Sequence, residues 1–395
     1  MFWRKRLTCG EKTAIDVTAR INLSQRLQIY DILINSPTQS IMTVIHVDRI
    51  RAATDISYAK AVRKPLEPAF VVYDPVFADI IGNDAAIELV EHRADDMFAH
   101  EAGVYVKRTN SVYFTANFQT SDPIACYAVD CDNHSKITKV EYPEVYQANG
   151  ACSYKDCVLY CSQGDRSHSS ALVLSDPVTG TSEVLINNFH GREFNSVNDV
   201  VIHHPTGDIW FTDPTYGYEQ AFRPPPVLPN QVYRFVPATK EIYCLADGFE
   251  MCNGLCFSPD YKTLYVTDTG AVQAHAGPGD GHSFSTNLRK QATIYAYDVT
   301  THAGGSTLSN RRTFAFCDTG IPDGIKCDEA GNVYSGCGDG IHVWDASGKL
   351  IGKIVVGGVA ANFCFVRGGM WVFGEKTLFW VKMHSKGALV SIECE

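Results

Sequence analysis

Six polar residues stand at matching positions of a repeated sequence phrase and are the main candidates for chemistry in this chain. In chain order they are Glu101, Asn149, Asn198, Asn253, Asp323 and Asn362. Each carries a side-chain carbonyl or carboxylate oxygen, and converging oxygen ligands are what Ca²⁺ requires. Zn²⁺ would prefer His or Cys, and neither occurs in the set. The pattern therefore predicts a site for Ca²⁺ or another divalent ion, although Asn and Asp also begin strands simply because they form turns well.

Two of the six residues, Glu101 and Asp323, are carboxylates that would balance the charge of a divalent ion. The Asn oxygens would fill further positions and leave room for water or substrate. An ion held in this way can polarise an ester carbonyl, stabilise the tetrahedral oxyanion and lower the pKa of a bound water. The residue types therefore favour an electrophilic site.

The phrase that carries these residues consists of a polar residue, a small or acidic one, an alternating apolar run, a turn and a second apolar run. Its clearest copies run over 198–213, 253–268 and 323–334. Each copy is typical of a β-hairpin, and six units of roughly 40–50 residues match the blade length of a β-propeller. We therefore predict an all-β, six-bladed propeller whose six oxygens meet at one mouth of the channel. A Gly-rich insertion at 274–282 should form a loop at one mouth.

Residues 1–65 do not follow the repeat, so we expect an N-terminal extension of partly helical or irregular structure and a catalytic propeller over 66–395. Within the extension, residues 23–34 could form a short amphipathic helix. The extension could cap the propeller, cover the pocket or mediate association, and its sequence does not decide among these. The oligomeric state is equally open.

Composition excludes several classes of function. The net charge of −10, from 34 Lys and Arg against 44 Asp and Glu, argues against nucleic-acid binding and suits a small-molecule substrate. No apolar run of about 18 residues exists, so no membrane span is predicted. The basic N-terminal start lacks the apolar segment of a secretory signal. We therefore expect a cytoplasmic protein whose 14 cysteines are mostly free, buried thiols.

Five motifs make the chain resemble the SMP-30/gluconolactonase/luciferin-regenerating superfamily, and most of all its fungal lactonohydrolase branch. They are AHEA at 99–102, FNSVNDV at 194–200, WFTDPTYG at 210–217, NGLCFSPD at 253–260 and PDGI at 322–325. The resemblance implies a six-bladed propeller with one catalytic divalent ion, usually Ca²⁺, held by Glu101, Asn198, Asn253 and Asp323. It also implies that Asn149 contacts the substrate. Val197 departs from the family, which often has Pro there; this change should not disturb the metal.

Within such a site, Asp323 is the candidate working carboxylate, either as general base toward a bound water or as nucleophile. Asp199, next to a predicted ligand, could orient a ligand or water, or it could be an ordinary strand-end Asp. Arg192, His100 and Tyr216 are candidate substrate-contacting residues at the rim of the pocket.

The leading hypothesis is a calcium-dependent, gluconolactonase-like lactonase in which water attacks a lactone carbonyl held against the ion. A non-hydrolytic enzyme of specialised metabolism, such as an isomerase, dehydratase or cyclase, is the alternative. The N-terminal extension and the Gly-rich insertion favour it, since they could close the pocket and exclude water. A metal-stabilised binding propeller without catalysis is the third possibility, and all three would keep the ring of ligands.

Overall fold

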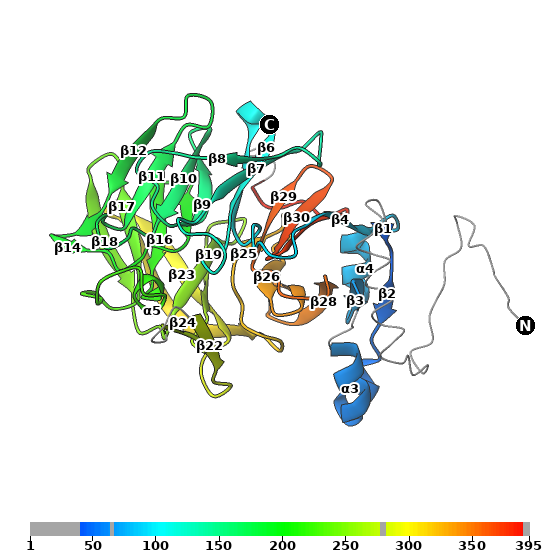
Figure 1. Cartoon of the computed structure of the whole chain (residues 1–395). Helices are drawn as coiled ribbons and strands as arrows, with labels where there is room; N and C mark the ends of the chain where they lie inside the picture. Colours follow the sequence, from blue (N-terminus) through cyan, green and yellow to red (C-terminus); the bar gives the residue numbers. More distant parts are fainter. Residues whose placement is uncertain (1–39, 64–66, 277–281, 390–395) are drawn as a thin grey trace, which may run out of the picture. The chain divides into compact units, whose positions relative to one another are not determined.

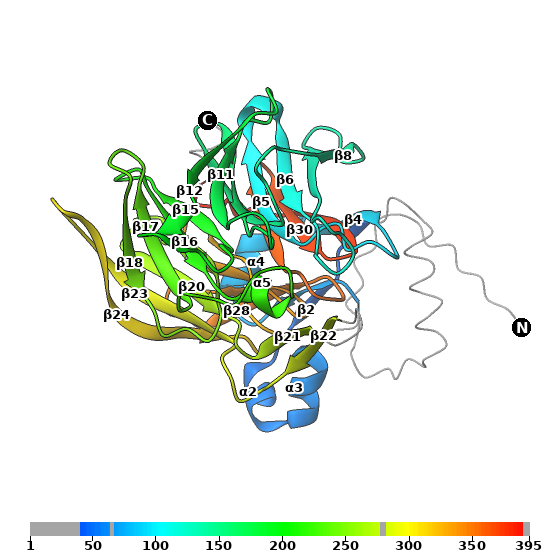
Figure 2. The ribbon, with the colours of Figure 1, turned by 60° about the vertical axis from the view of Figure 1, so that its left-hand side comes forward.

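The computed structural model describes residues 40–63, 67–276 and 282–389. Within them the chain forms six blade sheets around a common axis, so the predicted six-bladed propeller is confirmed (Figure 1, Figure 2). Every innermost strand begins at, or within two residues of, one of the six repeated polar residues, which are called the ring residues below. These strands are β5 (Glu101–Val106), β9 (Ala148–Tyr154), β15 (Val200–His203), β19 (Cys252–Phe257), β25 (Ile325–Cys327) and β29 (Asn362–Val366).

Each blade continues outward through antiparallel hairpins. The second strands are β6 (Ser111–Thr115), β10 (Cys157–Ser162), β16 (Asp208–Asp213), β20 (Thr263–Asp268), β26 (Val333–Cys337) and β30 (Gly369–Gly374). The third strands are β7 (Cys126–Asp130), β11 (Ala171–Ser175), β17 (Gln231–Val236), β23 (Thr293–His302), β27 (Gly340–Trp344) and β31 (Thr377–Lys382). The fourth strands are β8 (Ile137–Val140), β12 (Ser182–Ile186), β18 (Glu241–Ala246), β24 (Gly305–Phe316), β28 (Leu350–Val355) and β4 (Ala86–His92).

The ring is closed by strands that precede the first blade in sequence. β4 pairs antiparallel with β31, so the last blade combines both ends of the propeller, as the blue and orange ribbons of Figure 1 show. In the fifth blade β3 (Ala69–Val72) pairs antiparallel with β28. These pairings tie the early part of the chain to its late part and fix the six inner strands in one circle.

Part of the predicted N-terminal extension also joins the blades. β1 (Ser40–Ile41) pairs with β4, and β2 (Val44–His46) pairs in parallel with β3. Two short helices follow, α2 (Arg49–Thr54) and α3 (Ile56–Arg63). The expected helix at 23–34 lies outside the described residues, and a domain boundary near residue 65 stays a prediction.

Further elements lie between the blade strands. They are the helix α4 (Pro75–Ile81), the 3₁₀ turn η1 (Lys107–Thr109), the one-turn helix α5 (Tyr216–Glu219) and the hairpins β13 (Asn188–Phe189) with β14 (Arg192–Glu193) and β21 (Val272–Ala276) with β22 (His282–Thr286). The sequence predicts a loop over the Gly-rich insertion at 274–282, but residues 274–276 belong to β21 and His282 begins β22; residues 277–281 lie outside the described residues. Asp74 caps α4, because its side chain accepts a hydrogen bond from the Val76 amide.

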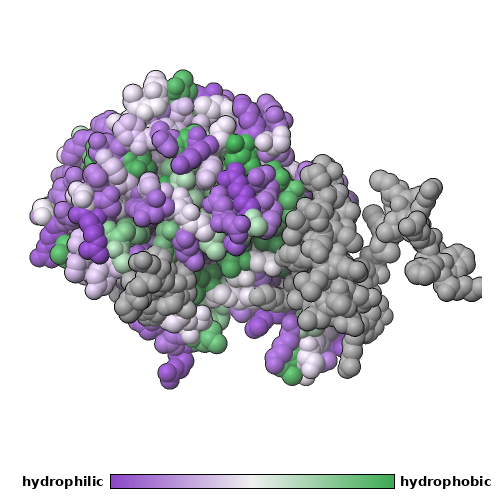
Figure 3. Space-filling view, viewed as in Figure 1, coloured by the Kyte–Doolittle hydropathy of each residue, from purple (hydrophilic) through white to green (hydrophobic). Residues whose placement is uncertain are grey.

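Large apolar side chains fill the spaces between neighbouring blades. Trp210 of β16 is fully buried and packs with Val232 of its own blade and Leu255 of the next. Burying a side chain of this kind contributes about 1.5–3 kcal/mol, so each interface between blades is a substantial apolar core. On the face that Figure 3 shows, hydrophilic residues cover much of the surface, and apolar ones gather in patches between them.

The cysteines agree with the prediction of free thiols. The twelve that the structure describes are all free, and most of these are buried. No helix among the described residues has the length and apolar character needed to cross a bilayer.

Candidate active site

A cavity of about 280 Å³ lies where the inner strands begin. Its wall includes five of the six ring residues, together with the predicted pocket residues His100 and Tyr216. Val272 of β21, which precedes the Gly-rich insertion, also lines it. The fold therefore gathers most of the predicted site residues around one space.

Four ring residues present a side-chain oxygen that is buried and has no hydrogen-bond partner within the described part of the chain. They are Glu101 through Oε1, Asn198 through Oδ1, Asn253 through Oδ1 and Asp323 through Oδ1. A buried polar atom without a partner costs about 1–3 kcal/mol. Two carboxylate and two amide oxygens around one cavity form a donor set that fits Ca²⁺, which binds hard oxygen ligands in irregular geometry.

The other two ring residues use their side chains to hold these ligands in place. Asn362 donates from Nδ2 to Glu101 Oε2 at 2.7 Å. Asn149 accepts at Oδ1 from Asn198 Nδ2 at 3.2 Å and from the Gly150 amide at 2.9 Å. Since the oxygens of Asn149 and Asn362 are occupied, these two residues orient the candidate ligands.

Irregularities in the inner strands aim two of the candidate ligands. In β5 the pairing register with β6 shifts between Ala102 and Val104, and Ala102 has a φ of 69°. In β19 the register with β20 shifts between Cys252 and Leu255, which flank Asn253. A β-bulge turns a side chain away from its regular direction and is frequent beside active sites.

The inner strands also approach one another closely just after the ring residues. A Cβ atom on Gly150 would stand 2.5 Å from the Asn198 carbonyl oxygen. One on Gly324 would stand 2.2 Å from the side chain of Asn362. Glycine is required at both positions because a neighbouring inner strand occupies the space that a side chain would need.

Three threonines near the ends of second strands fix the backbone of ring residues in the next blade. The Thr115 hydroxyl donates to the main-chain carbonyl of Asn149 at 3.1 Å. In the same way Thr212 donates to the carbonyl of Asn253 at 2.7 Å, and Thr267 donates to the carbonyl of Asp323 at 3.0 Å. The ring is therefore braced from blade to blade, which holds its oxygens in a defined arrangement.

The two carboxylates of the ring are electrostatically strained in the metal-free protein. Burial raises the pKa of Glu101 well above its ordinary range, and the neighbouring Asp323 carboxylate adds to the shift. Burial likewise raises the pKa of Asp323 to about 7. A divalent cation between them would relieve this strain by displacing protons that the pair otherwise retains.

His100 carries positive charge in the wall of the cavity because it is paired with Glu375. Its Nδ1 lies 2.9 Å from Glu375 Oε1, and Asn117 Nδ2 donates to Glu375 Oε2 at 3.1 Å. Burial lowers the pKa of His100, but the carboxylate outweighs burial and raises this pKa to about 9. Glu375 and Asn117 were missed from the sequence; both follow second strands, a position that also carries polar residues in other blades.

Tyr216 lies in the wall of the cavity and contacts a candidate ligand. Its hydroxyl accepts a hydrogen bond from Asn253 Nδ2 at 3.1 Å and also bonds to the Thr269 hydroxyl. Burial raises the pKa of Tyr216 further above its ordinary value, and Asp323 reinforces the effect, so the side chain stays a neutral phenol. Because Tyr216 accepts from Asn253 Nδ2, it fixes the orientation of the Asn253 side-chain amide and leaves Asn253 Oδ1 for a cation.

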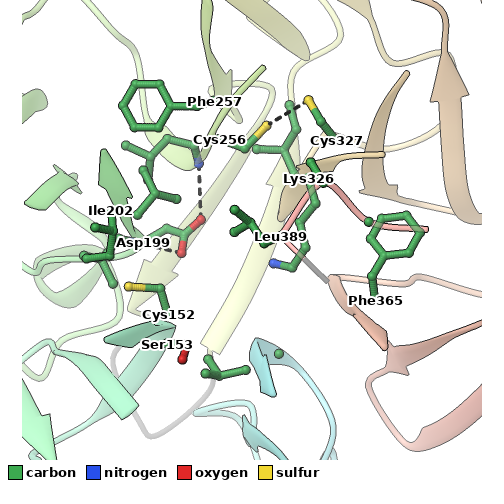
Figure 4. A pocket seen from close by; sticks show the side chains of 18 of the residues that line it. Cys152, Ser153, Asp199, Ile202, Cys256, Phe257, Lys326, Cys327, Phe365 and Leu389 are labelled. Atoms are coloured by element: carbon green, nitrogen blue, oxygen red, sulfur yellow. Dashed lines mark hydrogen bonds between the residues drawn. The ribbon is translucent and has the colours of Figure 1, made fainter. Parts of the chain in front are cut away.

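Asp199 does not line this cavity. Its carboxylate accepts from the Val200 amide at 2.9 Å and from the Leu255 amide at 3.2 Å. Figure 4 shows it on a smaller pocket, of about 120 Å³, whose wall is mostly apolar and also includes Lys326. Successive residues of an extended chain point to opposite sides, so Asp199 faces away from the cavity that Asn198 lines. The geometry gives Asp199 the role of linking two inner strands.

Arg192 is also placed away from the cavity. It lies exposed in β14 and is not part of the cavity wall, because the short hairpin of β13 and β14 carries it to the surface. The buried arginine of this region is Arg223, which donates to the main-chain carbonyls of Asn195 and Phe194, both at 3.0 Å. Arg223 therefore holds the segment that leads into the ring, and the substrate contact of Arg192 stays a prediction that its exposed position does not favour.

Comparison with known proteins agrees with this architecture. The family model described as SMP-30/Gluconolactonase/LRE-like region matches residues 101–288 and 280–379. Lactonohydrolase oryL of Aspergillus oryzae is 32% identical over 343 residues, which cover 80% of this chain and 78% of the relative. Lactonohydrolase oryH of the same fungus is 25% identical, with 85% of each chain covered. The solved gluconolactonase of Xanthomonas campestris is 25% identical with a TM-score of 0.64, over 81% of this chain and 96% of that one. The chain therefore belongs to the SMP-30/gluconolactonase/LRE-like family.

Proposed function

We propose that this protein is a lactonase that opens a small-molecule cyclic ester with the help of a divalent cation, Ca²⁺, in the propeller cavity. The observation that carries the proposal is the set of four buried oxygens that find no hydrogen-bond partner among the described residues, on Glu101, Asn198, Asn253 and Asp323. The relatives named lactonohydrolase and gluconolactonase support the reaction class.

The cation and the protein supply different parts of the chemistry. A bound Ca²⁺ supplies Lewis acidity toward the ester carbonyl and toward a bound water. In our proposal the Asp323 carboxylate takes the proton of the attacking water. Water adds to the carbonyl carbon, the ring C–O bond breaks, and the leaving oxygen takes up a proton, which yields a hydroxy acid. Direct attack by Asp323 as nucleophile is the variant of this scheme.

Two further residues of the cavity wall suit the substrate. Asn149 uses its side-chain oxygen to accept two hydrogen bonds, and its Nδ2 makes none among the described residues, so that N–H group can donate to the substrate. His100 is kept cationic by Glu375 and can stabilise the developing oxyanion or the product carboxylate. Both groups line the same cavity as the candidate ligands.

The test is pH-stat hydrolysis of a panel of aldonolactones, dihydrocoumarin, an aliphatic γ-lactone and a macrolactone, with calcium and with chelator. We expect turnover of at least one lactone that is lost on chelation and restored by calcium. Hydrolysis in ¹⁸O-labelled water should place the label in the product carboxylate. Calcium-bound protein that leaves the whole panel unchanged would contradict the proposal and favour the non-hydrolytic alternative.

A further inference from the structure

A second cluster of ligating side chains lies in and beside the fifth blade, apart from the ring. Cys317 follows β24, Cys337 ends β26, and His342 lies in β27. Their two Sγ atoms and a ring nitrogen of His342 all lie within 4.8 Å of one another. Each of the three residues is at most 2% exposed. The cluster is therefore a compact, buried set of two thiols and one imidazole.

The imidazole of His342 is oriented by a carboxylate on its far side. Nε2 lies 2.6 Å from Asp339 Oδ1. The other ring nitrogen, Nδ1, is buried and has no hydrogen bond of normal geometry among the described residues. A histidine that gives its N–H to a carboxylate keeps the lone pair of the other nitrogen free, which is how metal-bound histidines are held in proteins.

Charged groups behind the histidine hold this arrangement. Lys353 is fully buried, and its Nζ donates to Asp318 Oδ1 at 2.6 Å, to Asp339 Oδ2 at 3.3 Å and to the Arg63 carbonyl at 3.1 Å. Asp339 thus bridges His342 and Lys353. Such a group of buried charges is costly unless every member is paired, so the fold specifies the orientation of the imidazole.

We propose that Cys317, Cys337 and His342 bind a Zn²⁺ ion. Two thiolates and an imidazole form a donor set that Zn²⁺ accepts and that hard Ca²⁺ avoids. Zn²⁺ takes both sulfurs as thiolates and the imidazole in its neutral form, so its binding releases the protons that these groups hold.

Cys337 belongs both to the cluster and to the wall of the ring cavity, which Gly320 and Gly338 also line. Three protein ligands leave a fourth position for water. The zinc site shares no ligand with the ring, so the proposal stands independently of lactone hydrolysis.

The chain contains a matched control for the two thiols. Cys256 and Cys327 are also buried, with their Sγ atoms 3.8 Å apart. The groups of potential ligands found among the described residues do not include this pair. If proximity of two buried thiols were enough to bind zinc, both pairs would do so; if the oriented imidazole is required, only the pair at Cys317 and Cys337 will.

The test is metal titration of the reduced, chelator-treated full chain in excess Ca²⁺, which keeps oxygen sites occupied. We expect one Zn²⁺ per chain, and Co²⁺ in its place should give thiolate-to-cobalt charge-transfer absorption. Cys317→Ser should lose the zinc and the absorption, whereas Cys327→Ser should keep both. Glu101→Gln, which alters only the ring, should leave the zinc stoichiometry unchanged.

Three results would overturn the proposal. One is wild-type protein that binds no more zinc than Cys317→Ser, and another is bound Co²⁺ without a thiolate band. The third is a Cys317–Cys337 disulfide found by peptide mapping of the freshly purified protein. Should Cys317→Ser fail to fold, the cobalt spectrum of the wild-type protein decides by itself.

Discussion

Replacing Glu101 by Gln removes one negative charge from the ring while almost preserving the shape of the side chain. Glu101 Oε2 accepts from Asn362 at 2.7 Å and from the Ala102 amide at 3.1 Å, whereas Oε1 has no partner. In Glu101→Gln the oxygen should keep those two donors, so the –NH₂ group would point to the place where a cation binds. The variant therefore loses a ligand and gains a repulsive dipole there.

The size of the effect can be worked out. Removing one partner of a buried charge pair costs about 3–5 kcal/mol, which corresponds to a calcium affinity weaker by on the order of 10²- to 10⁴-fold. Calcium at about 100 times the wild-type Kd stabilises the wild-type fold by about 2.7 kcal/mol. At the same calcium concentration, a variant with 100-fold weaker calcium affinity would be stabilised by only about 0.4 kcal/mol.

In the metal-free protein, Glu101→Gln should not lower the stability of the fold and should even raise it. The pKa of Glu101 is raised in the folded state, so its contribution to stability is greatest at low pH and is lost as the pH rises through the raised pKa. Near neutral pH, Glu101→Gln removes this destabilising charge, and the metal-free variant should unfold at the same temperature as wild type or higher. Calcium should then stabilise the wild type more than the variant.

Differential scanning fluorimetry with and without calcium, together with calorimetric calcium titration, measures both effects. Glu183→Gln is the matched control, because Glu183 is exposed in β12 and should leave calcium affinity unchanged. If Glu101→Gln binds calcium with the affinity of the wild type and shows the same calcium-induced thermal shift, the reasoning about the ring is refuted.

Other predictions concern turnover. Asp323→Asn should lower kcat by about 10²–10⁴-fold with the circular dichroism spectrum unchanged; a kcat near wild type would remove its assigned role. Glu375→Gln takes away the charge that raises the pKa of His100 to about 9, so the alkaline limb of the kcat/KM profile should move to lower pH, and an unmoved limb would count against a cationic His100. Arg192→Ala should keep kcat/KM within about twofold, since the side chain is exposed and outside the cavity; a larger loss would return Arg192 to the substrate site.

Periodicity in the sequence was enough to predict the propeller and the position of the ring. A phrase that repeats once per blade marks rotationally equivalent positions, and six such positions must converge if the blades surround one axis. Each of the six residues indeed lies at or beside the start of an innermost strand. The roles of Glu101, Asn198, Asn253 and Asp323 as ligands stay predictions, supported by their four buried oxygens, which have no hydrogen-bond partner in the part of the chain that the structure describes.

Features that depend on pairing between distant strands could not be read from the same pattern. Glu375 meets His100 across 275 residues of sequence, and it follows a second strand rather than leading a first one. The alternatives for Asp199 could not be decided from its adjacency to Asn198, because successive residues of an extended chain point to opposite sides. The closure of the ring by β4 likewise depends on a register that only the folded chain reveals.

The most direct test of the calcium ring is a crystal structure of the calcium-loaded protein, with anomalous scattering to identify the ion. We predict one Ca²⁺ in the cavity, roughly 2.3–2.6 Å from the partnerless side-chain oxygens of Glu101, Asn198, Asn253 and Asp323. Calcium bound elsewhere, or those four oxygens hydrogen-bonded only to water in the calcium-loaded crystal, would contradict the account.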